Sequence, residues 1–470
     1  MVGRVAQHEL IRFCRNGRAR SLFFVVVVLL VAALVLSLRD YQLAYEHYED
    51  NVRQARANWE AQTAKDPHDA AHDGTYIIKP IHPLALLDAG LRPFSGQVVH
   101  LSAHQRKQGS LHESKDHSGM FRFGTMTPTF VLIYVLPLLL IFVGYQTVTE
   151  ERERQTIRLL LVQGISSRQL LLGKWMALAI IMLPLWLLFF ASAGIAYEAV
   201  TKMVSVSPIE WAAMAGIYLA YFLIFINFIV WISATAKSSG IALTVLLTIW
   251  IVVTLIVPKI STNLAGTFYP FPTLQTFRDA INKDQVNGLN GHNFWNEAAQ
   301  DFQQQVLEEY GVERIEDLPV AYSGLLLAEG EKYESAVYTK HFDLLQDQYE
   351  KQREVYRWCS ILSPLLPVRF VSMALARTDY GFLWHFEDEV EAYRVVLNTA
   401  LNMNIAENAK GVEKYQAGTD LWETMPVFDY TWQAPGHITR AHAIELLLIV
   451  LWAFLSFVGF LLFTRDIKAL

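Results

Sequence analysis

The fold class is decided by one continuous stretch of the chain. Residues 130–174 read FVLIYVLPLLLIFVGYQTVTEERERQTIRLLLVQGISSRQLLLGK. The first part, residues 130–148, is almost wholly apolar and long enough to cross a bilayer core of ~30 Å as a helix rising ~1.5 Å per residue. A charged segment follows, and apolar residues then lead up to Lys174. The pattern predicts a membrane span, a loop at the membrane surface and the start of another span.

Apolar runs of similar length recur along the 470 residues, of which 53% are hydrophobic and 18% charged. Lipid offers no partners to backbone groups, so each run is expected to be a helix. We predict an all-α polytopic membrane protein with a helical extracytoplasmic domain. A disordered chain, a disulfide scaffold and a freely soluble enzyme are excluded, and the net charge of −6 gives no reason to expect nucleic acid. The six predicted spans are residues 21–38, 127–148, 175–198, 211–235, 240–258 and 443–463.

Basic residues in the short segments predict the orientation. They precede the first span, fill the loop 149–174, include Lys237 between the fourth and fifth spans, and follow the sixth span. These segments lie on one side of a six-span chain, so we expect both termini in the cytoplasm. Residues 1–20 would form an amphipathic connecting helix and residues 464–470 a tail. The first span is expected to be an uncleaved anchor, because it is long for a signal peptide and five spans follow.

The same topology sends residues 39–126 and 259–440 outside, since long loops cross largely regardless of charge. Large apolar and aromatic residues recur there every three or four positions, for example in Glu329–Trp358. This period marks amphipathic helices with one buried face. We expect one helical domain assembled from both segments, with the polar stretches Asp66–Asp73 and His100–His117 as loops.

The loop 149–174 begins as a charged helix in which Glu150 and Arg154 are one turn apart and can pair. It turns apolar through Ile157–Val162 and breaks at Gly164. A short amphipathic helix in this place suits a partner that pushes on it. A solvated interfacial turn explains the pattern about as well.

This loop resembles that of the ABC-2 type permeases, the membrane subunits of ATP-driven exporters, whose pattern is Glu-Arg-Glu, Gly-Thr-Leu-Arg, a Leu-rich run, a Ser/Arg segment and Gly-Lys. Gln155 stands where the family commonly has Gly, and Gln163-Gly164 replaces the usual Ser-Pro. The residues that fit are Glu151, Arg152, Glu153, Thr156, Arg158, Leu159, Leu160, Ser167, Arg168, Leu172, Gly173 and Lys174. The resemblance implies a coupling helix that docks on an ATPase through Glu150, Glu151, Arg152, Glu153, Arg154, Thr156, Ile157, Arg158 and Leu159.

The resemblance also implies the partners and the cofactors. Gly173-Lys174 is followed by Trp175, so the chain lacks the Gly-Lys-Ser/Thr loop that holds phosphates and Mg²⁺. ATP and Mg would be bound by separate ABC ATPase subunits, and this chain would hold no cofactor. A type V exporter plan implies a second permease, identical or homologous, in the bacterial inner membrane and among its lipids. The long outer segment, with the stretches Ser363–Asp379 and Phe386–Arg394, resembles a subgroup of bacterial permeases that carry an extracytoplasmic domain.

We therefore expect a permease that exports an unidentified substrate. The alternative is a membrane subunit that relays ATP-driven motion to a periplasmic partner without moving a substrate. A membrane-embedded enzyme ranks third, because no nucleophile–base arrangement is visible. Asn227, a polar residue at mid-membrane depth, is a candidate for the translocation route, although bonding to a neighbouring helix is the commoner role.

Histidines are concentrated in the first outer segment. His68 and His72 are four residues apart, and His100 and His104 repeat that spacing. On helices each pair would face one way and could bind Zn²⁺ or Cu²⁺. These four are weak candidates for a metal site and for copper- or zinc-related transport, because histidines in a polar loop are ordinary and no HExxH motif or Cys cluster accompanies them.

Overall fold

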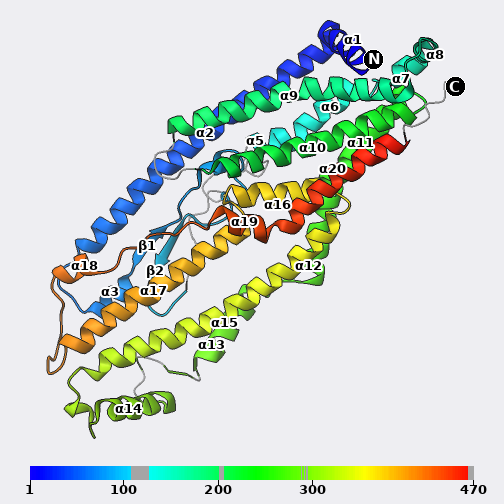
Figure 1. Cartoon of the computed structure of the whole chain (residues 1–470). Helices are drawn as coiled ribbons and strands as arrows, with labels where there is room; N and C mark the ends of the chain where they lie inside the picture. Colours follow the sequence, from blue (N-terminus) through cyan, green and yellow to red (C-terminus); the bar gives the residue numbers. More distant parts are fainter. Residues whose placement is uncertain (107–125, 201–205, 287, 290–291, 293–294, 464–470) are drawn as a thin grey trace.

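The computed structural model describes residues 1–106, 126–200, 206–286, 288–289, 292 and 295–463, and it is mostly helical (Figure 1). The described residues contain six helices long and apolar enough to cross a membrane, as expected for a multi-pass membrane protein. The prediction of a helical membrane protein is confirmed, and the described residues also contain a two-stranded sheet. The six candidate spans are Gly17–Glu60, Pro128–Glu153, Ser167–Glu198, Pro208–Thr235, Ser239–Phe268 and Ala443–Leu462.

The elements follow one another in a simple order. The second candidate span contains α5, η3, α6 and α7, and the fifth contains α11, η4 and α12. In chain order the elements are α1 (Val2–Arg15), α2 (Gly17–Glu60), α3 (Pro67–Asp73), β1 (Thr75–Ile78), η1 (Pro83–Leu86), β2 (Val98–Leu101), α5 (Pro128–Phe130), η3 (Val131–Val135), α6 (Leu136–Gly144), α7 (Thr149–Glu153), α8 (Thr156–Val162), α9 (Ser167–Val200), α10 (Pro208–Thr235), α11 (Ser239–Ile251), η4 (Val252–Ile256), α12 (Val257–Phe268), α13 (Leu274–Val286), α14 (Glu297–Tyr310), η5 (Ile315–Asp317), α15 (Tyr322–Cys359), α16 (Leu365–Leu375), α17 (Tyr380–Asn408), α18 (Asp420–Thr424), α19 (Pro435–Ala441) and α20 (Ala443–Phe463).

Proline explains the wide π-helical turns η3 and η4. Pro137 and Pro258 each lie two residues after such a turn. A proline has no N–H to donate, and its ring clashes with the carbonyl four residues earlier. The wider π turn moves that carbonyl aside and lets the helix continue.

The bundle has two distinct ends. Helices α1, α7 and α8 and the last turn of α20 lie at one end, which we call the proximal face, and α3, α14 and α18 lie at the other (Figure 1). Helix α2 has 44 residues, so it is about 66 Å long at ~1.5 Å per residue, roughly twice the thickness of a bilayer core. It is therefore long enough to cross the membrane and to continue beyond it as one rod.

Residues 39–106 and 269–440, apart from α16 (Leu365–Leu375), form what we call the distal domain. Long helices α15 and α17 pack against each other, with α3 on α17 and β1 beside α2. Strands β1 and β2 pair antiparallel, with Thr75 opposite Leu101. The prediction of a loop over Asp66–Asp73 is wrong: Asp66 caps α3 by accepting a hydrogen bond from the His68 N–H, and Pro67 begins the helix. His100 lies on a strand, and residues 107–117 of the second expected loop are outside the described residues.

The segment Ser363–Asp379 contains α16, which packs against spans α10 and α20 rather than among the distal helices. Leu365, Val368 and Val371 are buried in the same apolar core as the spans. A separate core lies further out, where Trp59 and Trp422 meet edge to face. Helix α16 thus lies between the spans and the distal domain.

Candidate functional site

Helix α8 projects from the proximal face with its apolar side partly uncovered. Ile157 is buried among the spans, whereas Arg158 is exposed and the Leu159 and Val162 side chains are 62% and 87% exposed. Exposing large aliphatic side chains to water is unfavourable, and such a patch commonly marks a surface that another protein covers. The predicted coupling residues thus divide: Arg158 and Leu159 face outward, and Ile157 anchors the helix.

The turn between α7 and α8 requires an unusual backbone conformation. Gln155 lies in the left-handed region with φ 60° and ψ 13°. Glycine adopts this conformation without strain, whereas other residues lose ~1–2 kcal/mol. The family pattern that the loop resembles has Gly at the position of Gln155, and a left-handed backbone is a physical reason for glycine there.

Other predicted coupling residues fix α7 to the turn between α10 and α11. Arg152 donates hydrogen bonds to the carbonyls of Ala234 (2.6 Å) and Ala236. The Glu153 carboxylate accepts bonds from the N–H of Ser239 (2.7 Å) and from its hydroxyl (3.0 Å) at the N-terminus of α11. A carboxylate is stabilised there by the helix dipole and the unpaired N–H groups. These two residues connect α7 rigidly to the fourth and fifth spans.

A buried ion network joins α7 to α1 and α9. The Lys174 ammonium is inaccessible to solvent, 2.5 Å from the Glu9 carboxylate and 3.6 Å from that of Glu151. Arg12 pairs with Glu150 and lies 3.8 Å from Glu151. The predicted Glu150–Arg154 pair is confirmed at 2.6 Å.

Smaller contacts complete this network. Thr156 donates a hydrogen bond to the Glu151 carboxylate across the α7–α8 turn. Gly173 lets α1 approach α9, because a Cβ at this position would lie 2.5 Å from Val5 and 2.9 Å from the Val2 carbonyl. Gly173 and Lys174 therefore both contact α1. The glycine leaves room for the close approach of α1, and the lysine binds the Glu9 carboxylate on that helix. These contacts connect α7 and α8 to α1, α9 and the α10–α11 turn.

Asn227 lies inside the bundle and is only 2% exposed. Its carbonyl oxygen accepts a hydrogen bond from the Trp175 indole (2.8 Å), and its amide donates to the Ser456 hydroxyl (2.8 Å). The side chain therefore connects α10 to α9 and α20. A place on the translocation route stays a prediction for this residue.

A cavity of about 550 Å³ lies where the spans meet the distal domain. This volume is within the usual range for sites that hold small molecules. Side chains from α15, α16 and α17 contribute aromatic rings and guanidinium groups to its wall. Among the lining residues are Tyr349, Tyr356, Tyr380, Trp384, Arg353 and Arg369.

Ion pairs hold the floor and wall of this cavity. Arg369 on α16 pairs with the buried Asp88 at 2.6 Å, and Asp88 also accepts a 2.6 Å bond from the Ser372 hydroxyl. Arg353 on α15 pairs with Glu445, at the start of α20, at 3.2 Å. The sequence prediction did not single out these residues, because their partners are 92 to 284 positions away in the chain.

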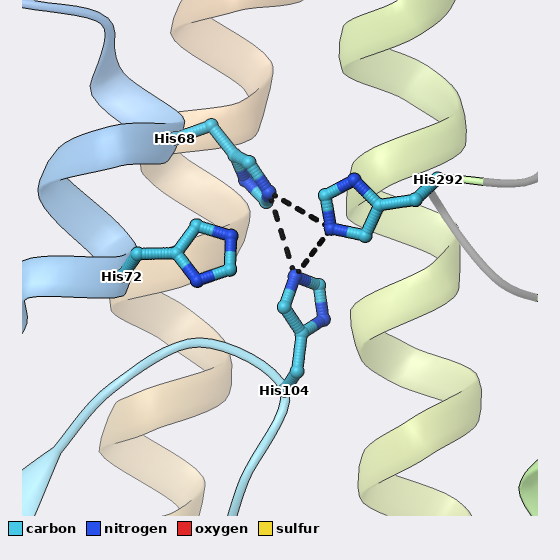
Figure 2. Close-up of side chains that lie close together, drawn as sticks. All are labelled: His68, His72, His104 and His292. Atoms are coloured by element: carbon cyan, nitrogen blue, oxygen red, sulfur yellow. Dashed lines mark hydrogen bonds between the residues drawn. The ribbon is translucent and has the colours of Figure 1, made fainter.

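Four histidines meet in the distal domain, brought together from three separate segments (Figure 2). His68 and His72 come from α3, His104 follows β2, and His292 lies between α13 and α14. The weak sequence candidates His68, His72 and His104 are thus brought together. His100 is not part of this group: its ring contacts the Asp73 carbonyl and Tyr76. The helical spacing that suggested His100 fails because β2 ends at Leu101, between it and His104.

The environments of the four rings differ. Burial lowers the pKa of His68 to about 4, with smaller contributions from the three neighbouring imidazoles. Burial also acts to lower the pKa of His104, but its hydrogen bond to Glu334 and the charges of Glu334 and Glu331 together raise it. Burial lowers the pKa of His292, and His104 and His72 add to that effect. His68 and His292 are therefore neutral imidazoles near neutral pH, the form that binds metal ions.

Comparison with known families gives two matches. Residues 4–318 match the model described as ABC-2 family transporter protein. Residues 274–431 match the model described as domain of unknown function DUF3526, which extends over α13 to α18. No curated protein matches the chain.

Proposed function

Because the chain belongs to the ABC-2 family of transporter membrane proteins, we propose that it is the permease subunit of an ATP-driven exporter in the bacterial inner membrane. Members of this family are typically non-catalytic and generally pair with ATPase subunits. ATP and Mg would be bound by those subunits, and a second permease, identical or homologous, would complete the transporter. Both termini and the proximal face would then lie in the cytoplasm, consistent with the basic residues of the short segments.

The observation that carries this proposal is the exposed face of α8. Arg158, Leu159 and Val162 offer one positive charge and two uncovered aliphatic side chains at the tip of the proximal face. Behind them, the ion network around Lys174 ties α7 to α1 and α9. An ATPase docked on α8 would push against a rigid assembly rather than a flexible loop, so its motion would reach the spans.

The cavity between the spans and the distal domain supports export of a substrate. Its volume suits a small molecule, and its aromatic and charged lining suits an amphiphilic one. In this proposal the substrate passes between the two permeases, and the distal domain forms a gate or chamber above the route.

The experiment that tests ATPase docking is a charge reversal on α8. The chain is co-purified with its ATPase and reconstituted in lipid, and ATP hydrolysis is measured for wild type and Arg158→Glu. We expect at least a roughly tenfold loss of coupled ATPase activity, the change that ~1.4 kcal/mol of lost interaction produces. Arg314→Glu is the matched control, because Arg314 is an exposed arginine on the distal domain that pairs only at the surface, with Asp317. Equal activity of both variants would refute docking on α8.

The second candidate is relay of motion to a periplasmic partner, and the continuous rod of α2 favours it. Near its far end, Trp59 donates a 3.0 Å hydrogen bond to the Trp422 carbonyl and Arg56 donates one to the Glu423 carbonyl. A push at the proximal face would therefore move the α18 region directly. Met373 lines the cavity, so Met373→Trp would fill it and distinguish the two candidate functions. A substrate exporter would lose export and keep its ATPase activity. A relay of motion would continue to work.

A further inference from the structure

We propose that His68, His72, His104 and His292 form a binding site for a tetrahedral divalent ion of the Zn²⁺ kind, which fastens the distal domain together. This site goes beyond the proposed function and does not depend on it. One ligand atom from each ring lies within 4.8 Å of the others. Zn²⁺ sites with four protein ligands are commonly structural.

The distances between ring nitrogens indicate the geometry. The Nε2 atoms of His68, His104 and His292 are separated by 3.0, 3.3 and 3.4 Å (Figure 2). Two nitrogens bound to one Zn²⁺ at ~2.0–2.1 Å, at a tetrahedral angle, are ~3.3–3.4 Å apart. A square-planar Cu²⁺ site would place two of any three nitrogens on opposite sides of the ion, ~4 Å apart. The triangle thus fits a tetrahedral ion better.

The opposite nitrogens of two rings are held by neighbours that fix the tautomer. His68 Nδ1 donates to the Asn402 Oδ1 at 3.0 Å, and His104 Nδ1 donates to the Glu334 carboxylate at 2.7 Å. With the proton on Nδ1, each Nε2 presents its lone pair toward the other rings. Metal-binding histidines almost always have such a carboxylate or carbonyl partner on the other nitrogen. In these tautomers His292 can donate from Nε2 to a neighbouring ring, but the Nε2 atoms of His68 and His104, 3.4 Å apart, both present lone pairs, and a cation between the rings would relieve their repulsion.

The carboxylates behind His104 are themselves rigid. Glu331 is fully buried, accepts the His104 backbone N–H at 2.9 Å and pairs with Arg394 at 2.6 Å. Arg394 also pairs with Glu391 at 2.8 Å. Glu331 and Glu391 pair with the Arg394 guanidinium, and Glu334 contacts the His104 ring, so these three carboxylates exceed the one guanidinium by two negative charges, which a divalent cation would offset. Because Glu331 and Glu334 contact Nδ1 of His104, they support the ring instead of competing for the ion on Nε2.

The backbone around His104 is also held in place for this arrangement. His104 adopts the left-handed conformation with φ 61°, which a non-glycine residue rarely takes. The Ala103 N–H donates to the Ala71 carbonyl at 2.8 Å and so ties the loop after β2 to α3. Gly74 lets β2 approach, since a Cβ there would lie 1.9 Å from the Leu101 carbonyl oxygen. Strained backbone that the surroundings enforce is characteristic of functional positions.

An ion in this site would connect parts of the chain that are far apart in sequence. His72 and His292 are exposed, so the ion would enter from solvent. It would join α3 and the loop after β2 to the connection between α13 and α14, next to helices α15 and α17. The bound ion would therefore stiffen the distal domain.

The test uses the full-length protein in detergent, stripped with a chelator and then dialysed against Zn²⁺. We expect one retained Zn²⁺ per chain by elemental analysis, and a higher thermal midpoint with Zn²⁺ than without. Co²⁺ in place of Zn²⁺ should give the intense visible absorption of a tetrahedral site. His292→Ala and His72→Ala, both at exposed positions, should each weaken Zn²⁺ binding at least tenfold in calorimetric titration.

Two further variants make the test specific. His100→Ala is the matched control, a histidine of the same hairpin outside the cluster, and should bind Zn²⁺ like wild type. Glu334→Gln keeps all four rings and should weaken binding 10- to 100-fold, as loss of a carboxylate behind a ligating histidine does. The proposal would be overturned if wild type retained no stoichiometric Zn²⁺. It would also be overturned if the His72→Ala/His292→Ala double variant, with the same metal-free thermal midpoint as wild type, bound Zn²⁺ equally well. Binding of Cu²⁺ alone, with no Co²⁺ spectrum, would also overturn the tetrahedral assignment.

Discussion

Replacing Lys174 by Met is expected to loosen α1 from the rest of the bundle. The Lys174 ammonium has no solvent exposure and lies 2.5 Å from Glu9 and 3.6 Å from Glu151. Removing one partner of a buried ion pair costs ~3–5 kcal/mol, because the remaining charge is left buried and unpaired. Arg12 remains 3.9 Å from Glu9 and 3.8 Å from Glu151 and compensates in part. We therefore expect the free energy of unfolding to fall by about 2–3 kcal/mol.

A double-mutant cycle measures this interaction directly. The free energy of unfolding is determined by denaturant titration in mixed micelles for wild type, Lys174→Met, Glu9→Gln and the double variant. Residues in direct contact within an ion network couple by ~0.5–3 kcal/mol, and we expect a value in the upper half of that range. The control is Lys237→Met, the same change at an exposed lysine of the proximal face, which should stay within ~0.5 kcal/mol of wild type. A Lys174→Met effect no larger than the control, or a coupling energy near zero, would refute the network as a tie between α1 and α9.

Three further outcomes follow from the same geometry. Gly173→Val should destabilise the protein by about 1–3 kcal/mol and expose α1 to protease, because the new side chain overlaps Val5; an unchanged digestion pattern would contradict this packing. Gln155→Gly should be neutral or raise the free energy of unfolding by up to ~1 kcal/mol, whereas Gln155→Val should lower it by about 1–2 kcal/mol, since only glycine is unstrained at φ 60°. Asn227→Leu should lower it by about 0.5–2 kcal/mol because Trp175 loses its acceptor; a thermal midpoint equal to wild type would count against this role.

The coupling loop shows how far local sequence reasoning extends. Charge spacing predicted the pair Glu150–Arg154, and the resemblance to related permeases drew attention to Gln155 as a position where Gly is common. Both concern neighbours within one turn, where a single helix fixes which side chains meet. The contacts of Glu153 with Ser239 and of Lys174 with Glu9 were not predicted, because they join segments 86 and 165 positions apart. Glu153 accepts hydrogen bonds at the N-terminus of α11, so Glu153→Lys would lower stability as well as docking, and Arg158→Glu is the cleaner test of docking.

The histidine site shows where such reasoning stops. The spacing of His68 and His72 was visible, but the polar composition of Asp66–Asp73 led to the prediction of a loop. The stretch is a short helix that starts at Pro67 and is capped by Asp66. His100 was proposed on helical spacing and lies on a strand. His292 comes from a connection 188 positions beyond His104, and no periodic pattern marks it.

The sequence by itself determined that this is a multi-pass membrane protein, and the described residues contain six helices long and apolar enough to cross a membrane. A bilayer core requires about twenty apolar residues per span, and hydrogen bonding within each span leaves the backbone no other structure. Only the tertiary structure decided that α16 packs against the spans, that a cavity lies between α16 and the helices α15 and α17, and that four histidines converge in the distal domain. The physical reason is that the membrane fixes each span locally and independently of the rest. Outside the lipid, burial and ion pairing between remote segments choose the arrangement, and a linear pattern does not record which segments meet.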